Sequence, residues 1–421
     1  MSELMKITSN DVDKSLVKKT CIKFIMAIQH LIAMFGATVL VPILTGLDIS
    51  VALFSAGVGT LIFHICTKNK VPVFLGSSFA FIPVIIAVSE TYGDLAYAQG
   101  GILVSGLIYV IMSFLIKKIG KDRLQAILPA QVVGPMIMVI GLNLIPTAFD
   151  MAKTNIVIAV ITLGTTLIIK YFGKGFFSQV AIICGVAVGY TISFFTGLVD
   201  TTAISNASML AVPNFTLPKF DIGAIMMIAP VVLATFMEHI GDITTNGQVV
   251  GKDFIEDPGL NRTLLGDGLA TITASLFGGP ANTTYGENTG VLAITKNYDP
   301  SILRLAAVFA IILSFISKFG MIIKTIPSAV MGGISLILFT MIALVGVRTI
   351  KHERVKINFK NILIMSTILV IGFVGKIIED KYGIVIGIRI TDSITMSGLS
   401  FAAVVGVILN LILNGNKKDN I

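Results

Sequence analysis

Long apolar stretches recur along the whole chain, and short polar connections separate them. Many of these stretches reach the roughly 20 residues that an α-helix needs to cross a lipid bilayer. The pattern predicts an all-α membrane protein with fourteen transmembrane segments. The predicted segments are 22–44, 49–66, 71–90, 97–116, 125–148, 155–172, 177–197, 222–248, 259–278, 280–295, 301–323, 326–347, 361–378 and 394–414.

A longer polar connection, from about 200 to 221, separates the first seven segments from the second seven. Because seven is odd, the second set would enter the membrane in the opposite direction to the first. Short matches in the correct order support two inverted seven-segment repeats, the usual plan of secondary transporters. A shift of 209 residues pairs Gln29-His30 with Glu238-His239 and Ser77-Ser78-Phe79 with Gly286-Glu287-Asn288, and a shift of 198 residues pairs Pro129-x-x-Val132-x-Gly134 with Pro327-x-x-Val330-x-Gly332.

The composition is typical of a protein whose solvent is mostly lipid. Hydrophobic residues make up 55% of the 421 residues and charged residues only 13%, whereas soluble domains carry about 25% charged residues. The formal charge of +8 does not indicate a nucleic-acid partner, because the basic residues follow the topology. With both termini in the cytoplasm, 24 of the 31 Lys and Arg residues lie on the cytoplasmic side, as the positive-inside rule requires.

Segments three and ten each begin with a stretch that is unsuited to a helix. Residues 71–76 read Val-Pro-Val-Phe-Leu-Gly, and residues 278–284 read Gly-Gly-Pro-Ala-Asn-Thr-Thr. Pro lacks a backbone donor, and Gly and β-branched residues favour extended backbone. Because extended backbone inside a membrane must be paired or line a cavity, we expect two short antiparallel strands, each leading into a half-helix. The half-helix N-termini would offer free N–H groups to a ligand rich in carbonyl groups; the alternative is a pair of re-entrant loops without a ligand.

Ionisable residues inside membrane segments are rare and costly, so each is a candidate for function. Segment eight carries Glu238, His239 and Asp242, and segment ten carries Glu287. Glu238 and Asp242 are four residues apart and therefore lie on one helical face. Three carboxylates without an adjacent cation would repel one another if all were ionised, so at least one is expected to hold a proton near neutral pH. A proton-coupled carrier needs such a group.

Structural roles stay open for several of these residues. Glu238 could tie helices together, and Asp242 could simply belong to the polar end of its helix. His239 is expected to pack or to bridge helices, and Asp267 in segment nine to hold a helix interface. The sequence contains no metal-ligand spacing, nucleotide-binding motif or catalytic triad, so neither an enzyme nor a metal or cofactor is expected.

The tenth segment also carries the motif that points to a family. It reads Asn282-Thr283-Thr284-Tyr285-Gly286-Glu287-Asn288-Thr289-Gly290, followed by Thr295-Lys296. This run resembles the signature of the nucleobase–ascorbate transporter (nucleobase:cation symporter) family, which has an acid or amide, Asn, any residue, Gly, four residues, Thr and a basic residue. Residues 29–37 and 76–81 (Gly-Ser-Ser-Phe-Ala-Phe) add to the resemblance, which covers essentially the whole chain.

The resemblance implies a core domain and a gate domain, each built from both repeats. The core would comprise residues 1–123 (segments one to four) and 221–324 (segments eight to eleven). The gate would comprise residues 124–220 (segments five to seven) and 325–421 (segments twelve to fourteen). The resemblance further implies a multi-pass protein of the bacterial cell membrane that imports uracil by alternating access, with the proton as coupling ion and a homodimer through the gate domain.

Residue roles follow from the same resemblance. The expected substrate site consists of Glu238, Glu287, Phe79, Gly286, Ala37 and Tyr285. The two carboxylates would accept the ring N–H groups of uracil, the backbone amides at Phe79 and Gly286 would meet its carbonyl groups, and the other two residues would shape the pocket. Purine-transporting members typically carry Gln at the position of Glu287, which favours uracil over a purine.

The candidates for proton coupling are the three carboxylates Glu287, Asp242 and Glu238. The best-known family pattern has a histidine one turn after the first glutamate, and this chain has Asp242 there. The alternatives are a purine (xanthine or urate) permease of the same fold and an anion transporter or channel of the same architecture.

Overall fold

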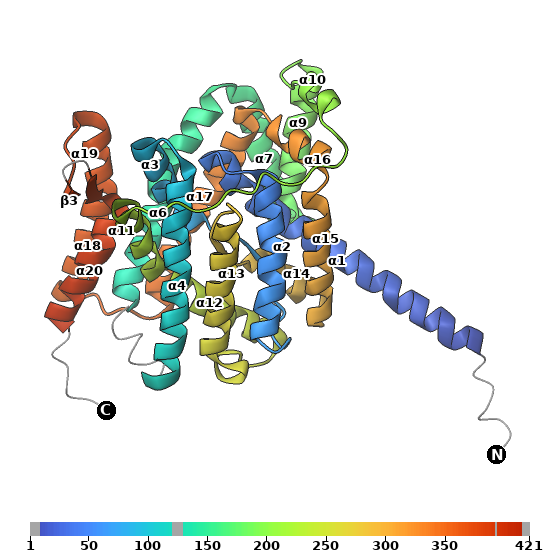
Figure 1. The fold of residues 1–421 in the computed structure, drawn as a ribbon, viewed down its shortest axis with the longest axis horizontal. Coiled ribbons are helices and arrows are strands. Elements are labelled where there is room, and N and C mark those ends of the chain that lie inside the picture. The colour runs from blue at the N-terminus through green and yellow to red at the C-terminus, as the bar shows by residue number, and fades with distance from the viewer. Residues whose placement is uncertain (1–8, 120–128, 392–393, 415–421) are drawn as a thin grey trace.

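The computed structural model describes residues 9–119, 129–391 and 394–414, and these are mostly helical (Figure 1). In the first half the helices are α1 (Ser9–Thr45), α2 (Ile49–Cys66), α3 (Ile82–Tyr92), α4 (Leu95–Ile119), α6 (Ala130–Lys153), α7 (Ile156–Phe172), α8 (Phe176–Gln179), α9 (Ala181–Phe195) and α10 (Thr201–Asn206). In the second half they are α11 (Ile222–Ile228), α12 (Val232–Val250), α13 (Leu260–Leu276), α14 (Gly286–Thr295), α15 (Pro300–Ser314), α16 (Ser317–Lys324), α17 (Ser328–His352), α18 (Phe359–Leu369), α19 (Gly375–Tyr382) and α20 (Gly398–Asn414). The strands are β1 (Leu75–Ser77), β2 (Asn282–Thr284), β3 (Gly387–Thr391) and β4 (Ile394–Ser397).

Within the described residues, seven helical stretches are long and apolar enough to cross a membrane, or eight if the bent pair α15 and α16 is one span. Four shorter apolar helical stretches lie at 79–92, 156–172, 181–195 and 398–414. The fold is therefore that of a mostly helical, multi-pass membrane protein. Each of the fourteen predicted segments contains helix, but the number of crossings stays a prediction.

The structure shows a sharp bend within the predicted eleventh segment. The sequence predicts one helix over 301–323, but α15 and α16 are bent by 83°. Ile316 at the bend has a non-helical ψ of 89°. The freed backbone groups are paired with the connection between the halves: Phe315 O accepts from Ala211 N at 3.0 Å, and Ser317 N donates to Met209 O at 3.1 Å. The bend is thus stabilised by a segment remote in sequence.

The structure adds a strand pair at the start of segment fourteen. The prediction places strands in segments three and ten, and β3 and β4 form a further antiparallel pair before α20. Residues 387–391 (Gly-Ile-Arg-Ile-Thr) alternate β-branched residues with others, which is a strand pattern. The pattern is easily missed because apolar segments flank it on both sides.

The helices pack into two groups. In one, α2 lies against α13 and α15, α4 lies along α13, and α1 contacts α15. In the other, α6 lies along α17, α7 packs between α9 and α17, and α18 contacts α6 and α20. Each group therefore combines helices from both halves of the chain, since α1, α2 and α4 meet α13 or α15 while α6, α7 and α9 meet α17.

Reciprocal glycines let two helix pairs approach closely. A Cβ on Gly134 of α6 would lie 3.0 Å from the Gly346 carbonyl oxygen of α17, and a Cβ on Gly346 would lie 2.4 Å from the Gly134 oxygen. Gly106 of α4 and Gly268 of α13 repeat the arrangement, with both Cβ to oxygen distances at 2.9 Å. Small residues at such crossings are typical of helices packed in membranes, where van der Waals contact drives association.

We expect Gly346→Val to destabilise the protein strongly, because the new side chain meets the backbone of α6, which cannot move aside cheaply. Overpacking of this kind costs about 1–3 kcal/mol. The measurement is the thermal unfolding midpoint of purified protein in detergent. Gly164→Val on α7 is the matched control, since a Cβ at Gly164 meets nothing within 4 Å. Equal midpoints for the two variants would contradict this account of the α6–α17 contact.

The connection between the halves runs as an extended segment from α10 to α11 across one end of α15, α2, α13 and α4 (Figure 1). Lys219 N donates to Ala96 O at 2.8 Å, and Lys219 Nζ lies 2.8 Å from Asp94 Oδ2. The hydrogen bond from Lys219 lowers the pKa of Asp94 below its usual value. The connection is thereby attached to the helices beneath it.

Candidate functional site

The two short strands β1 and β2 meet in the interior as an antiparallel pair. Leu75 pairs with Thr284, Gly76 with Thr283 and Ser77 with Asn282. The ladder continues at both ends, because Ser78 N donates to Ala281 O at 2.8 Å and Tyr285 N donates to Phe74 O at 3.0 Å. All six strand residues are buried.

Threonine side chains from neighbouring helices satisfy the outer edges of this two-stranded sheet. Leu75 N donates to Thr60 Oγ1 of α2 at 2.9 Å, and Asn282 N donates to Thr271 Oγ1 of α13 at 3.3 Å. Extended backbone at membrane depth is tolerated only when its polar groups are paired in this way. The two threonines therefore hold the strands inside the helical frame.

We expect Thr60→Val to destabilise the fold, because it keeps the shape of the side chain but leaves the Leu75 N–H without its acceptor. A buried unpaired group of this type costs about 1–3 kcal/mol. The thermal unfolding midpoint in detergent measures the loss. Thr340→Val is the control, since the exposed Thr340 bonds only to Leu336 O of its own helix. A midpoint for Thr60→Val as high as that of the control would refute the role of this edge bond.

Each strand leads into a short helix whose N-terminus has no side-chain cap. Ser78 precedes the 3₁₀ turn Phe79–Phe81 and α3, and Tyr285 precedes α14; neither side chain caps the helix that follows. By contrast, six other helices are capped by Asp48, Asn155, Asp200, Asp221, Asp299 and Asn358. A helix N-terminus with free N–H groups attracts a carbonyl or anionic group.

Open space lies at the start of α14. Gly286 is exposed although Tyr285 before it is buried and Glu287 after it is half-buried, and a Cβ at Gly286 would meet nothing within 4 Å. Phe79, at the other uncapped N-terminus, is half-buried. Open space therefore lies at the start of α14, whereas the start of the other half-helix is partly covered.

The structure brings the three predicted carboxylates together. Glu238 and Asp242 lie on α12, which packs against β2 and α14, the element that begins with Gly286 and Glu287. All three carboxylate residues are half-buried and lie within electrostatic range of one another. Asp242 Oδ2 also accepts a hydrogen bond from Thr284 Oγ1 of β2 at 3.1 Å. The acidic face of α12 is therefore turned towards the strands and α14.

His239 points elsewhere on α12. Its Nδ1 lies 2.8 Å from Asp267 Oδ2, and its Nε2 lies 2.9 Å from Thr263 Oγ1, both on α13. All three side chains are buried. The contact has the geometry predicted for both residues, since His239 bridges two helices and Asp267 holds their interface.

Tyr285 and Ala37 lie in the apolar cluster that packs against Phe79. Tyr285 and Ala37 are buried in one apolar cluster, and Phe79 packs against that cluster. The Tyr285 hydroxyl donates to Ser77 O at 2.9 Å and accepts from Thr38 Oγ1 at 3.3 Å. A Cβ at Gly76 would lie 2.3 Å from the Tyr285 ring, so this glycine leaves the space that the ring occupies beside β1.

Several polar contacts around the site were not apparent from the sequence pattern. Asn246 Nδ2 on α12 donates to Pro72 O at 3.0 Å and to Thr289 Oγ1 at 3.1 Å, which ties α12 to the stretch before β1 and to α14. Asn288 Nδ2 donates to His30 O at 3.0 Å. The available signal was the presence of Asn and His within apolar segments, but their partners lie far away in sequence.

The α7–α9 connection, which belongs to the other group of helices, packs on α14. A Cβ at Gly290 of α14 would lie 2.3 Å from Gln179 Oε1 of α8, and α8 packs on α14. Lys170, near the end of α7, lies within electrostatic range of Glu287. The site is therefore bordered by elements of both helix groups.

Comparison with known proteins defines the class. A family model described as "Permease family" (Xan_ur_permease) matches residues 22–380. The chain belongs to this family, as the resemblance in its tenth segment predicts, and it is a membrane transporter rather than an enzyme.

Particular relatives cover nearly the whole chain. It is 41% identical to the "Probable uracil permease" of Haemophilus influenzae over 404 residues, which span 94% of this chain and 95% of that protein. It is 42% identical to the "Uracil permease" of Bacillus subtilis, with 93% of each chain covered, and 38% identical to the "Uracil permease" of Escherichia coli K12, with 92% and 90% covered.

Two solved structures share the fold at low identity. The transmembrane domain of the cyanobacterial bicarbonate transporter BicA matches with a TM-score of 0.59 and 16% identity, covering 93% of this chain and 96% of that one. SLC26A9 matches with a TM-score of 0.69 and 11% identity, covering 93% of this chain and 64% of that one. These similarities support the helical architecture alone.

Proposed function

We propose that this chain imports uracil across the cell membrane by proton symport. The observation that carries the proposal is the pair of half-buried carboxylates, Glu238 and Glu287, beside two uncapped helix N-termini at paired strands. The near full-length similarity to proteins named uracil permease supports the choice of substrate. Uracil presents two ring N–H donors and two carbonyl acceptors, which match two carboxylates and two sets of free amides.

Each group has a role in this proposal. Glu238 and Glu287 accept the two ring N–H groups, and the N–H groups at Phe79 and Gly286 donate to the two carbonyls. Ala37 and Tyr285 shape the pocket around the ring. Buried donors and acceptors that match a ligand in this way reject analogues that leave one of them unpaired, because an unpaired buried polar group is costly.

Proton coupling is supported by the charges at the site. Among the described residues, none of the three carboxylates Glu238, Asp242 and Glu287 forms an ion pair with Lys or Arg. Three carboxylates within electrostatic range repel one another when ionised, and a proton on one of them relieves the repulsion. Binding of a proton and of a neutral base can thereby depend on each other.

The proposed architecture is two inverted seven-segment repeats that cross the membrane fourteen times. The strand register supports it, because Leu75 pairs with Thr284, which is 209 residues further on, the shift that also relates Gln29-His30 to Glu238-His239. A two-fold axis through this pair would exchange the halves. The first helix group corresponds to the proposed core (1–123 and 221–324), and the second to the proposed gate (124–220 and 325–421).

Transport would proceed by displacement of the core against the gate around the site. The distribution of Lys and Arg supports cytoplasmic termini, and the family resemblance supports a homodimer through the gate. No cofactor beyond the coupling proton takes part in this proposal.

Purified protein in proteoliposomes tests the proposal directly. Uptake of labelled uracil should rise when an inward proton gradient is imposed and should fall to background when a protonophore removes it. Excess unlabelled uracil should compete, and excess xanthine or urate should not. Uptake that depends on sodium alone, or competition by purines rather than uracil, would overturn the proposed coupling or the proposed substrate.

An anion transporter or channel is the alternative on the same architecture, since BicA and SLC26A9 show only that the fold is shared. The acidic residues at the site disfavour it, since Glu238, Asp242 and Glu287 would repel an anion where the half-helices meet. Bicarbonate or chloride flux through the same proteoliposomes, insensitive to Glu287→Gln, would favour the anion transporter instead.

A further inference from the structure

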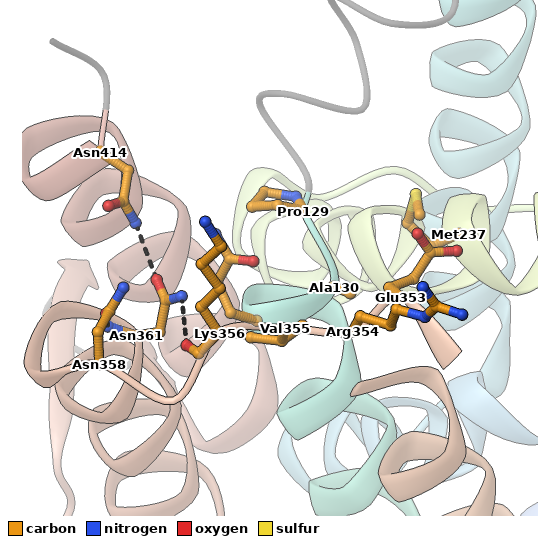
Figure 2. A pocket seen from close by; sticks show the side chains of 11 residues that line it. Pro129, Ala130, Met237, Glu353, Arg354, Val355, Lys356, Asn358, Asn361 and Asn414 are labelled. Atoms are coloured by element: carbon orange, nitrogen blue, oxygen red, sulfur yellow. Dashed lines mark hydrogen bonds between the residues drawn. The ribbon is translucent and has the colours of Figure 1, made fainter. Parts of the chain in front are cut away.

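A cavity that is lined by none of the proposed substrate-site residues lies at the end of the helices near Pro129 and Asn414 (Figure 2). Its volume is about 390 Å³. Three elements of the second helix group line it: the start of α6, the connection between α17 and α18 with the first turn of α18, and the end of α20. The remaining contact is Met237 of α12, the residue immediately before Glu238.

The charged side chains that line this cavity are mostly basic. Arg354 and Lys356 line the cavity together with one acid, Glu353, and residues 348–360 contain five Lys or Arg residues against that single acid. Neither Arg354 nor Lys356 forms an ion pair with any residue in the described ranges. Two cations that form no ion pair with a described residue, beside a cavity of this size, favour an anionic occupant.

Hydrogen-bond donors face the same space. The first residues of α6, Ala130 and Gln131, line the cavity, and Pro129 at the N-cap position supplies no side-chain cap. The α6 N-terminus therefore adds free N–H groups and the positive end of a 24-residue helix to the two cations. Asn358 lies at the edge of the cavity, with its Oδ1 engaged by Asn361 N at 2.8 Å.

A network of side-chain amides holds this wall in place. Asn361 Nδ2 donates to Lys356 O at 2.9 Å, and Asn361 Oδ1 accepts from Asn414 Nδ2 at 3.2 Å (Figure 2). Asn414 and Gln131 both donate to Asn410 Oδ1, at 3.1 Å each. Because Asn410 and Asn361 are buried, the network links α6, α18 and α20 firmly and presents Lys356 from a fixed backbone.

We propose that this cavity binds the phosphate group of an anionic ligand. Arg354 and Lys356 neutralise its charge, and the N–H groups at the start of α6 donate to its oxygens. Headgroups of anionic phospholipids and soluble phosphates share this chemistry. An occupant touches Met237 on α12 as well as the gate elements, so it stabilises one arrangement of α12 relative to α6, α18 and α20.

The test uses the full-length protein and compares a double variant with a charge-matched control. Arg354→Gln/Lys356→Gln removes both cations of the cavity. Arg348→Gln/Lys351→Gln removes the same charge from exposed positions on the same basic stretch that do not line it. Thermal unfolding midpoints are recorded in phosphatidylcholine vesicles, with and without phosphatidylglycerol, and separately with inorganic phosphate. The unfolding midpoint does not depend on transport, so a failure of this proposal can be distinguished from a failure of the proposed function.

A ligand of the folded state raises the unfolding midpoint. We expect phosphatidylglycerol or inorganic phosphate to raise the midpoint of the wild type and of the control by about 2 °C or more, and to leave that of Arg354→Gln/Lys356→Gln unchanged. A response to phosphatidylglycerol alone identifies a lipid headgroup, and a response to inorganic phosphate identifies a soluble ligand. If neither probe shifts the wild type, or if the double variant responds as the control does, the proposal is wrong.

Discussion

Glu238→Gln and Glu287→Gln are each expected to abolish measurable uracil uptake while the protein still folds and inserts. An amide of the same size lacks the negative charge that strengthens the hydrogen bond from a ring N–H of uracil, and hydrogen bonds to charged groups contribute about 1.5–3 kcal/mol each. Uracil affinity should therefore fall by about 10- to 100-fold. Binding of labelled uracil to purified protein and uptake into proteoliposomes measure the two effects.

The matched control is Glu256→Gln. Glu256 is exposed in the turn between α12 and α13, so this substitution makes the same chemical change away from the proposed site. The control should transport like the wild type. Unfolding midpoints for all three variants separate loss of binding from loss of fold. Uptake at the wild-type level by Glu238→Gln or Glu287→Gln would remove that residue from the proposed site.

Asp242→Asn should separate uracil binding from the proton gradient. Asp242 lies one turn from Glu238 and is held towards β2 by a hydrogen bond from Thr284. Binding of a proton to Asp242 therefore changes the electrostatic repulsion on both Glu238 and Glu287. A gradient of one pH unit supplies about 1.4 kcal/mol per proton, enough for about tenfold accumulation of a neutral substrate. The variant should lose this accumulation and retain exchange of labelled for unlabelled uracil at equal pH.

Thr284→Val provides the comparison for this experiment. It removes the hydrogen bond to Asp242 but leaves every titratable group in place, so gradient-driven accumulation should persist with a shifted pH dependence. If Asp242→Asn accumulates uracil as the wild type does, the coupling proton resides elsewhere, on Glu238 or Glu287. If Thr284→Val loses more of the gradient-driven accumulation of uracil than Asp242→Asn does, proton coupling depends on the hydrogen bond between Thr284 and Asp242 rather than on titration of Asp242.

Asp242 occupies the place where the best-known pattern of the resembled family has a histidine. A histidine at this place would carry a positive charge when protonated, whereas Asp242 becomes neutral. Among three nearby carboxylates, a proton on Asp242 lowers the total negative charge without introducing a cation. The pH dependence of uptake by Asp242→His, measured against the wild type, would compare the two solutions within one protein.

Some features of the site could be predicted from local sequence because they rest on local chemistry. Pro72 and the run Gly278-Gly279-Pro280 cannot continue a helix, and β1 and β2 follow them. The spacing of Glu238 and Asp242 places both on one face of α12 whatever surrounds the helix. Clustering of acids in apolar segments marked the site because such residues are costly in a membrane.

Other features depend on partners that are remote in the chain. The bend between α15 and α16 depends on hydrogen bonds from the connection at 209–211, so the apolar run 301–323 by itself reads as a straight helix. The edges of β1 and β2 depend on Thr60 and Thr271, which look like ordinary helix residues. Periodicity describes which face of a helix is apolar, and it does not say which other helix or loop will meet that face.

The sequence by itself determined that this chain is a membrane protein, because its apolar stretches are long enough to cross a bilayer. It also determined the positions of the irregular segments and of the acidic residues, because Pro and Gly act on the local backbone. Only the tertiary structure decided that Glu238, Asp242 and Glu287 lie near one another, that His239 is turned away to Asp267, and that Arg354 and Lys356 share a cavity with the start of α6. The physical reason is that these placements come from helix packing between distant segments. Contacts such as those of Gly134 with Gly346 and of β1 with β2 set that packing, and no local property of the chain encodes their pairing.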